Sequence, residues 1–186
     1  MVLAFTGAGI SRDSGISTFM EQPEVRDRLY RSYAKSNPES YNKTIQQLAQ
    51  VINIAEPNDA HRALMEYAIP IITMNIDGLH EKAGSKPLCL HGVMPLDHEM
   101  AHAHELVGKP VLYGDPAPNY QKAMEMVSRL KEGDVLIVIG ASMHTGIAVE
   151  IRHYAKALGA ESIEIQASAK TEVRKTLARL KSEGKL

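Results

Sequence analysis

The run Val135-Leu136-Ile137-Val138-Ile139 restricts the fold of this 186-residue chain more than any other segment. It is apolar at every position, whereas a strand with one wet face alternates apolar and polar residues. Such a strand must be covered on both faces, which is typical of parallel sheets in α/β proteins. Shorter runs with strand composition lie at residues 2–5, 69–73, 87–90, 110–113 and 162–165.

Segments with helical spacing separate most of these runs. In residues 117–131, for example, Ala123, Met126 and Val127 fall on one face of a helix. Residues 147–158 and 171–180 show similar spacing. Strands that alternate with helices predict a single α/β domain, residues 1–186, built on a parallel sheet of about six strands with helices on both faces.

Two segments interrupt this alternation. Residues 24–55 are polar, helix-like and poor in strand signals, so we expect a small helical insertion there. Residues 93–108 are irregular and contain His98, His102 and His104. We expect this second segment to form a reduced small module at the edge of the domain.

Composition excludes several classes of protein. The chain has 21 basic and 22 acidic residues, which favours neither nucleic acid nor an anionic membrane as a partner. Its single cysteine, Cys89, excludes an internal disulfide framework and a four-cysteine zinc site. There is no apolar stretch of membrane-spanning length and no signal-peptide pattern, so we expect a cytoplasmic protein.

Polar clusters follow four of the apolar runs. They are Thr6-Gly7-Ala8-Gly9-Ile10-Ser11, Met74-Asn75-Ile76-Asp77, His91-Gly92 and Gly140-Ala141-Ser142. In an open parallel sheet, ligands bind in the crevice beyond the carboxyl ends of the strands. Glycine lets a backbone approach a phosphate because it lacks Cβ. The clusters therefore predict one shared site for a nucleotide.

The same segments resemble the sirtuins, the NAD-dependent protein deacylases. The matching strings are Gly7-Ala8-Gly9-Ile10-Ser11 with Ser14-Gly15-Ile16, Asn75-Ile76-Asp77-Gly78-Leu79-His80, Leu90-His91-Gly92, Val111-Leu112-Tyr113-Gly114-Asp115 and Ile139-Gly140-Ala141-Ser142-Met143. Of these, the string from Asn75 to His80 is the most specific. The match runs along nearly the whole chain in the family's order.

The resemblance implies a Rossmann-like domain that binds NAD and an acylated protein or peptide. By this resemblance, the NAD-binding residues are Gly7, Ala8, Gly9, Ser11, Phe19, Met74, Asn75, Ile76, Asp77, Gly140, Ala141, Ser142 and Gln166. Gly114 and Asp115 correspond to the family's substrate loop.

Three residues are expected to act in catalysis. Breaking the nicotinamide bond builds positive charge at the anomeric carbon of the ribose. Asn75 would orient the ribose or an attacking water, and Asp77 would hold the leaving carboxamide. In the family an acyl-lysine oxygen attacks that carbon, and His91 would take a proton from a ribose hydroxyl. Histidine suits this role because its ordinary pKa of about 6.5 makes it a base near neutral pH.

The chain departs from the sirtuin pattern at three places. Met20 replaces an arginine, for which Arg12 or Arg26 could substitute, and Met74 replaces a glutamine. No cysteine pairs follow His91, so residues 93–108 correspond to a vestigial zinc module and we expect no zinc. These changes leave two alternatives open: NAD glycohydrolysis or ADP-ribosyl transfer, and a non-catalytic sensor of NAD or ADP-ribose.

Several polar residues also have a purely structural interpretation. His98-Glu99-Met100-Ala101-His102 spells a zinc-hydrolase motif, for which His104 or Glu125 could be a third ligand. The segment is short and polar, so a solvated helix is the favoured interpretation. Asn75 and Asp77 could cap the helix that follows them. We expect His80 to bond the backbone of its local turn and His61 to be architectural.

Overall fold

Five parallel strands form the centre of the protein. The computed structural model describes residues 1–18, 21–143 and 145–186. The strands are β1 (Val2–Thr6), β2 (Ile71–Thr73), β3 (Leu88–Cys89), β4 (Val135–Ile139) and β5 (Glu161–Ile165). Their order in the sheet is β3-β2-β1-β4-β5, and all pairs are parallel. The predicted α/β fold with a parallel sheet is therefore confirmed.

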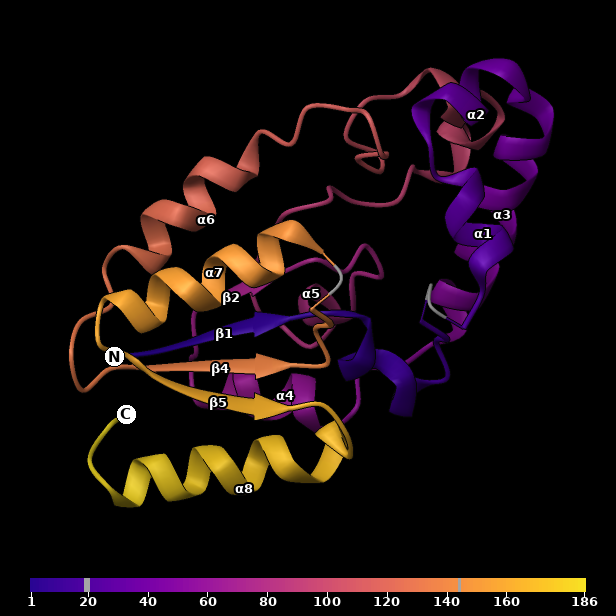
Figure 1. Ribbon diagram of the computed structural model, residues 1–186. Helices are drawn as coiled ribbons and strands as arrows, with labels where there is room; N and C mark the ends of the chain where they lie inside the picture. The colour runs from indigo at the N-terminus through magenta and orange to yellow at the C-terminus, as the bar shows by residue number, and fades with distance from the viewer. Residues whose placement is uncertain (19–20, 144) are drawn as a thin grey trace.

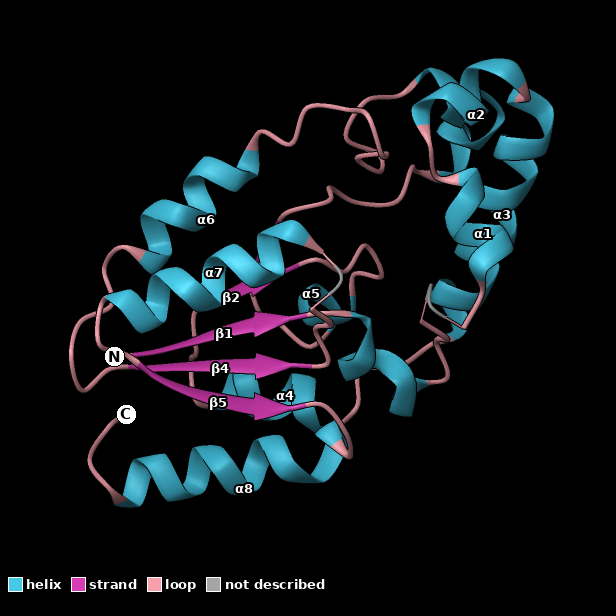
Figure 2. Ribbon diagram, viewed as in Figure 1, coloured by secondary structure: helices cyan, strands magenta, loops and turns pink. Residues whose placement is uncertain are grey.

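Helices cover both faces of this sheet (Figure 2). Ala4, Ile137 and Ile139 pack in a cluster with α4 (Asp59–Glu66) and α8 (Ala169–Ser182). Phe5, Leu136 and Val138 pack in a cluster with α6 (Asn119–Val127) and α7 (Gly146–Ala157). Alternate residues of each central strand thus enter opposite layers, which explains why the run at 135–139 is apolar throughout.

The sheet has five strands because residues 110–113 do not join it. Pro110 lacks a backbone N–H, and the side chain of Leu112 packs into a separate apolar cluster away from the sheet. The Tyr113 N–H donates to the Leu29 carbonyl, and its own carbonyl accepts from the Arg31 N–H. The prediction of a strand here was wrong, because Tyr113 pairs with the backbone of the helical segment and Val111 donates to the carbonyl of His91, which lies beyond the end of β3.

That separate cluster joins the two irregular segments of the sequence. The segment predicted as a helical insertion at 24–55 forms α1 (Pro23–Arg28), α2 (Arg31–Ser36) and α3 (Pro38–Ile54), which together span residues 23–54 and lie at one end of the molecule in Figure 1. Residues 93–108 hold a 3₁₀-helix, η2 (Asp97–Glu105). The cluster consists of Leu29, Ala34, Tyr41, Ile45, Ala49, Met100, Ala103 and Leu112. Apolar burial thus fixes η2 against α3.

A bidentate ion pair reinforces this contact. Arg31 Nε and Nη2 lie 2.7 Å from the two carboxylate oxygens of Asp115, and both side chains are largely buried. The same guanidinium donates to the carbonyls of His104 and Leu106. Arg31 therefore links α2, the end of η2 and the 114–115 loop.

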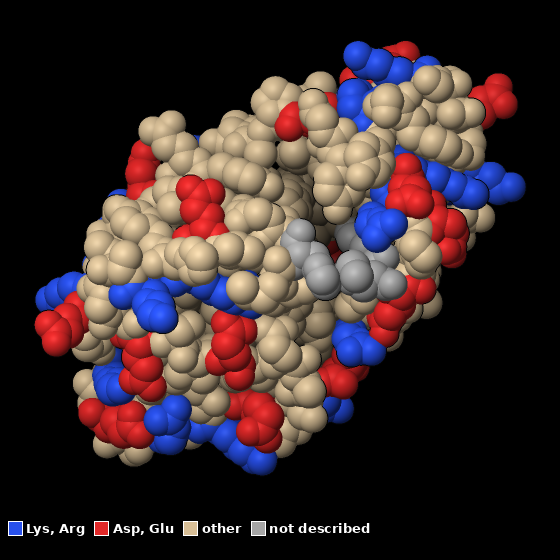
Figure 3. Space-filling model, in the orientation of Figure 1, with Lys and Arg blue, Asp and Glu red and all other residues tan. Residues whose placement is uncertain are grey.

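Charged residues elsewhere are mixed in sign. On the face drawn in Figure 3, basic and acidic side chains alternate without a large patch of one sign. Within the described ranges, no helix is both long and apolar enough to cross a bilayer.

We predict that Arg31→Ala lowers the free energy of unfolding by about 3 kcal/mol, because it leaves the Asp115 carboxylate unpaired. The Arg31 hydrogen bonds are the largest cause holding the pKa of Asp115 below its ordinary value. The stability they provide is present above the ordinary carboxyl pKa and is lost as pH falls through the lowered one. Urea unfolding from pH 7 to 3 should show this acid dependence in the parent and a weaker one in the variant. Arg26→Ala, which removes an exposed pair with Asp27, is the control and should change stability little.

Candidate active site

A close crossing of two loops lies at the carboxyl edge of the sheet. After β1, the chain enters a 3₁₀-helix, η1 (Ala8–Ser14), and passes the loop that follows β4. The N–H of Gly7 donates to the Ile139 carbonyl, and that of Gly9 donates to the Gly140 carbonyl, each at 2.9 Å. A Cβ on Gly9 would lie 2.6 Å from Gly140 Cα. Gly140 has a φ of +59°, and a Cβ there would lie 2.3 Å from the Ile10 nitrogen. The crossing therefore has no room for side chains at these positions.

A hydrogen-bonded carboxylate lies beside this crossing. The Ser11 hydroxyl donates to Asp77 Oδ2 at 2.6 Å. Asn75 Nδ2 lies 3.2 Å from both that oxygen and the Ser11 hydroxyl. The other oxygen, Oδ1, accepts from the N–H of Leu79 at 3.0 Å, the first residue of α5 (Leu79–Lys82). The N-cap of this helix is Gly78, so Asp77 bonds a backbone N–H at the helix start from the position before the cap, in addition to its contacts with Ser11 and Asn75.

Two buried histidines, His61 and His80, lie next to the hydrogen-bonded group of Ser11, Asn75 and Asp77. His61 Nδ1 accepts from the Asn58 N–H at 3.3 Å, and burial lowers its pKa to about 4. His80 Nε2 lies 3.0 Å from the Thr6 hydroxyl, and burial lowers its pKa to about 3. Both rings are therefore neutral near pH 7. The expectation that His80 bonds its own turn was wrong, because its ring reaches back to β1.

His91 follows β3, next to the end of β2. Its Nδ1 lies 3.1 Å from the Met74 carbonyl oxygen, and its Nε2 lies 3.0 Å from the Tyr120 hydroxyl. Burial lowers the pKa of His91, and the Met74 carbonyl offsets part of that shift. The imidazole is therefore mostly neutral at pH 7 and able to accept a proton.

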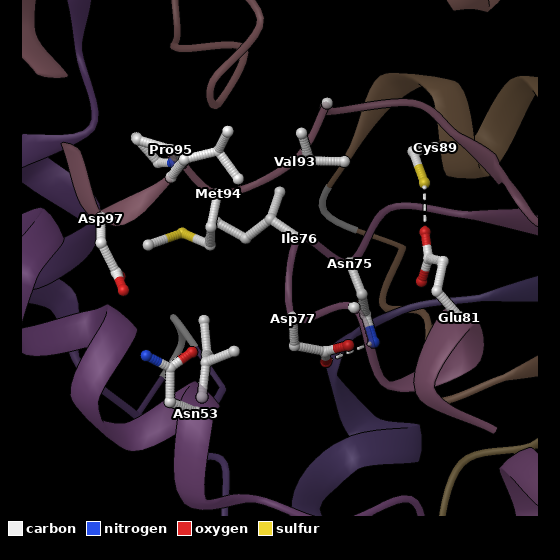
Figure 4. Close-up of a pocket in the computed structure, with 14 residues that line it drawn as sticks. Asn53, Asn75, Ile76, Asp77, Glu81, Cys89, Val93, Met94, Pro95 and Asp97 are labelled. Carbon is white, nitrogen blue, oxygen red and sulfur yellow. Dashed lines mark hydrogen bonds between the residues drawn. The ribbon is translucent and has the colours of Figure 1, made fainter. Parts of the chain in front are cut away.

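Two cavities open on this edge. The first, of about 330 Å³, lies between α3, the Asn75–Asp77 turn and residues 92–97, as Figure 4 shows. The second, of about 570 Å³, is lined by Ala141, Ser142, Met143, Arg152, Glu164 and Gln166. Gln166 Nε2 donates to the Ala141 carbonyl at 3.1 Å, which holds this side chain against the β4–α7 loop.

Comparison with known proteins identifies the family. Residues 7–105 match the model of the Sir2 family. An NAD-dependent protein deacetylase of Bacillus cereus is 35% identical over 176 residues, which cover 76% of this chain and 72% of that protein. The NAD-dependent protein deacylase 2 of Archaeoglobus fulgidus is 33% identical over 206 residues, covering 89% and 79%. This chain belongs to the Sir2 family.

Solved structures of Sir2 homologues have the same fold as this sirtuin. A mutant Sir2 homologue in complex with ADP-ribose superimposes with a TM-score of 0.81 at 24% identity, covering 100% of this chain and 93% of the other. A Sir2 homologue in complex with NAD gives a TM-score of 0.78 at 24% identity, covering 98% and 90%.

The structure brings most of the predicted NAD-binding residues to one edge. Gly7, Gly9 and Gly140 form the crossing, and Ala8 begins η1 beside it. The remaining residues divide between the cavities. Asn75, Ile76 and Asp77 line the first, Ala141, Ser142 and Gln166 line the second, and Ser11 bonds Asp77. Met74 contributes its carbonyl to His91, while its side chain packs in the cluster beside α6.

Other predicted residues are placed differently. Phe19, expected to bind NAD, lies outside the described residues, as does Met20. The Asp115 carboxylate forms an ion pair with Arg31, and Gly114 lies beside Arg31. Arg12 and Arg26, considered as substitutes for the missing arginine, pair with nearby acidic side chains.

The histidine motif at 98–102 lies on η2, not on an α-helix, and His102 has non-helical backbone angles. With about three residues per turn, positions four apart do not share a face. Glu99 instead pairs with Lys109 at 2.6 Å. Over residues 1–18, 21–143 and 145–186, no group of three or more His, Cys, Asp or Glu side chains is arranged to hold a metal ion.

Two site residues were missed in the sequence. Tyr120 follows Asp115 by five positions and lies in no recognisable motif, and Arg152 lies within a helical stretch. Arg152 Nη2 donates to the Ala141 carbonyl at 2.6 Å, while Nε lies 2.7 Å from Glu164. The contact of Tyr120 with His91 spans 29 positions, and those of Arg152 with Ala141 and Glu164 span 11 and 12; no sequence motif marks either residue.

We predict that Gly9→Ala destabilises the protein by about 1–3 kcal/mol and weakens NAD binding, because its Cβ would collide with the Gly140 backbone. Gly146→Ala is the matched control: apart from its chain neighbours and its own helix backbone, no atom of the described residues lies within 4 Å of its added Cβ. Thermal unfolding and calorimetric NAD titration measure both effects. Parent-like stability and affinity in Gly9→Ala would contradict the tight crossing.

Proposed function

We propose that this sirtuin is an NAD-dependent protein deacylase that cleaves NAD to nicotinamide and transfers the acyl group of an acyl-lysine to ADP-ribose. The observation that carries the proposal is the position of Asn75, Asp77 and His91 at adjacent strand ends beside the glycine crossing. Its relatives in the family are named as NAD-dependent protein deacetylases and deacylases.

The residues present fit a dinucleotide. Two cavities lie at the carboxyl edge of the sheet. At this edge Gly7, Gly9 and Gly140 carry no side chains that would cover their backbone. Gln166 and Ser142 provide polar groups in the second cavity, where we place the adenosine end. Asn75 and Asp77 provide an amide and a carboxylate in the first, where we place the nicotinamide end.

NAD supplies a ribose whose bond to nicotinamide breaks with growing positive charge at the anomeric carbon. The Asp77 carboxylate, held by Ser11 and Asn75, stabilises that charge or holds the leaving carboxamide. Asn75 orients the ribose. His91 accepts the proton of a ribose hydroxyl once the acyl oxygen has attacked.

We expect the protein to release nicotinamide from NAD only in the presence of an acylated lysine peptide. Release without peptide would favour NAD glycohydrolysis or ADP-ribosyl transfer. NAD binding without turnover for any acyl type would favour a sensor. Chromatographic measurement of nicotinamide and of the deacylated peptide separates the three.

We predict that His91→Ala lowers turnover by about a hundredfold or more while NAD affinity changes little, because the base acts after NAD is bound. His153→Ala, on the exposed face of α7, is the control and should keep the parent rate. An unaltered rate in His91→Ala would remove His91 from the mechanism.

The first cavity also predicts a preference among acyl groups. Its described lining contains the carboxylates of Asp77, Glu81 and Asp97 but no lysine or arginine, and Ile52, Ile76 and Met94 make part of it apolar. A neutral acyl chain is compatible with this lining, whereas a terminal carboxylate is repelled. We expect kcat/KM for succinyl-lysine to be at least about tenfold below that for acetyl- or butyryl-lysine. Equal values would contradict the placement of the acyl group in this cavity.

A further inference from the structure

Helix α6 places a tyrosine hydroxyl on the predicted catalytic base. Asn119, the first residue of α6, donates from Nδ2 to the Cys89 carbonyl at 2.8 Å, which fastens the start of the helix to β3. The next residue, Tyr120, has its hydroxyl 3.0 Å from His91 Nε2. The two ring centroids are 6.1 Å apart. Tyr120 therefore reaches His91 from an element that is itself anchored to the strand before His91.

The partners of the two ring nitrogens determine the tautomer of His91. Nδ1 faces the Met74 carbonyl, which can only accept a hydrogen bond, so Nδ1 carries the proton. The neutral ring then has its lone pair on Nε2. The Tyr120 hydroxyl must be the donor to that nitrogen. Burial raises the pKa of the Tyr120 phenol, so the hydroxyl stays protonated and able to donate.

We propose that Tyr120 is a positioning residue for His91: its hydroxyl holds the imidazole in the tautomer whose Nε2 accepts the ribose proton. This inference depends on the proposed function, in which His91 is the base. The Tyr120 hydroxyl leaves the Nε2 lone pair when the ribose hydroxyl approaches. The ribose O–H bond then breaks, its electron pair stays on the ribose oxygen, and the proton forms the Nε2–H bond. The Nδ1–H stays on the Met74 carbonyl.

The few polar contacts of His91 allow the effect of the Tyr120 hydroxyl on the pKa of His91 to be measured. Tyr120, from α6, is the titratable side chain in hydrogen-bond contact with the ring, and Tyr113 lies close enough to Tyr120 to raise the pKa of its phenol slightly. Among the described residues, no carboxylate or cationic side chain is hydrogen-bonded to His91. A donor to Nε2 stabilises the neutral ring and so lowers the pKa of His91. Removing it should raise that pKa.

The test is Tyr120→Phe, which keeps the ring and removes the hydroxyl. Nitrogen-15 NMR of histidine-labelled protein follows the tautomer and pKa of His91 without any need for turnover. We expect the pKa to rise by about half to one unit, and the Nδ1–H tautomer to be less dominant. Tyr67→Phe, at the end of α4 in the opposite layer, is the control and should leave both unchanged.

The pH profile of deacylation supplies a second readout. Because the base must be neutral, activity falls as pH drops below its pKa, so the acid limb of kcat/KM should move to higher pH by the same amount in Tyr120→Phe. The KM for NAD should change little. An unshifted pKa and tautomer in folded Tyr120→Phe would overturn the role of Tyr120. Absence of turnover in the parent protein would instead contradict the proposed function, and the NMR titration would still decide whether Tyr120 sets the state of His91.

Discussion

The backbone crossing of the β1–η1 loop with the β4–α7 loop is the contact on which the site depends. Gly7 and Gly9 donate to carbonyls at and just after the end of β4, and the space between these loops admits no Cβ. Because the loops touch backbone to backbone, the two central strands end at a fixed separation. The cavities on this edge owe their relative position to that contact. A methyl group at Gly9 would therefore disturb both at once.

At the predicted nicotinamide end, the Asp77 carboxylate is hydrogen-bonded only by neutral groups among the described residues. His61 and His80 are held neutral by burial, so neither offsets the negative charge of Asp77 near pH 7. The carboxylate is instead held by the hydroxyl of Ser11, the amide of Asn75 and a backbone N–H. Its charge thus remains available to a developing cation, which a neighbouring imidazolium would have weakened.

Residues 93–108 are held in place by packing against the helical segment of α1, α2 and α3. Met100 and Ala103 enter the same cluster as Tyr41 and Ile45, and Asn42 bonds the backbone of Ala101 and His104. Arg31 adds two carbonyl contacts and its pair with Asp115. These contacts position the wall of the first cavity formed by residues 93–97. The cavity wall therefore depends on the stability of this cluster.

The sequence by itself determined the layered α/β fold and the edge that carries the site. The unbroken apolar run at 135–139 predicts a central strand. Asn75, Asp77 and His91 each follow a predicted strand closely in the sequence, and this places them at the carboxyl edge of the sheet. Only the tertiary structure decided that residues 110–113 leave the sheet, that Asp115 binds Arg31, and that Tyr120 contacts His91. Each of these depends on a partner 29 to 84 positions away or on a competing backbone contact. Periodicity reports how one segment is buried, but not which distant side chain meets it.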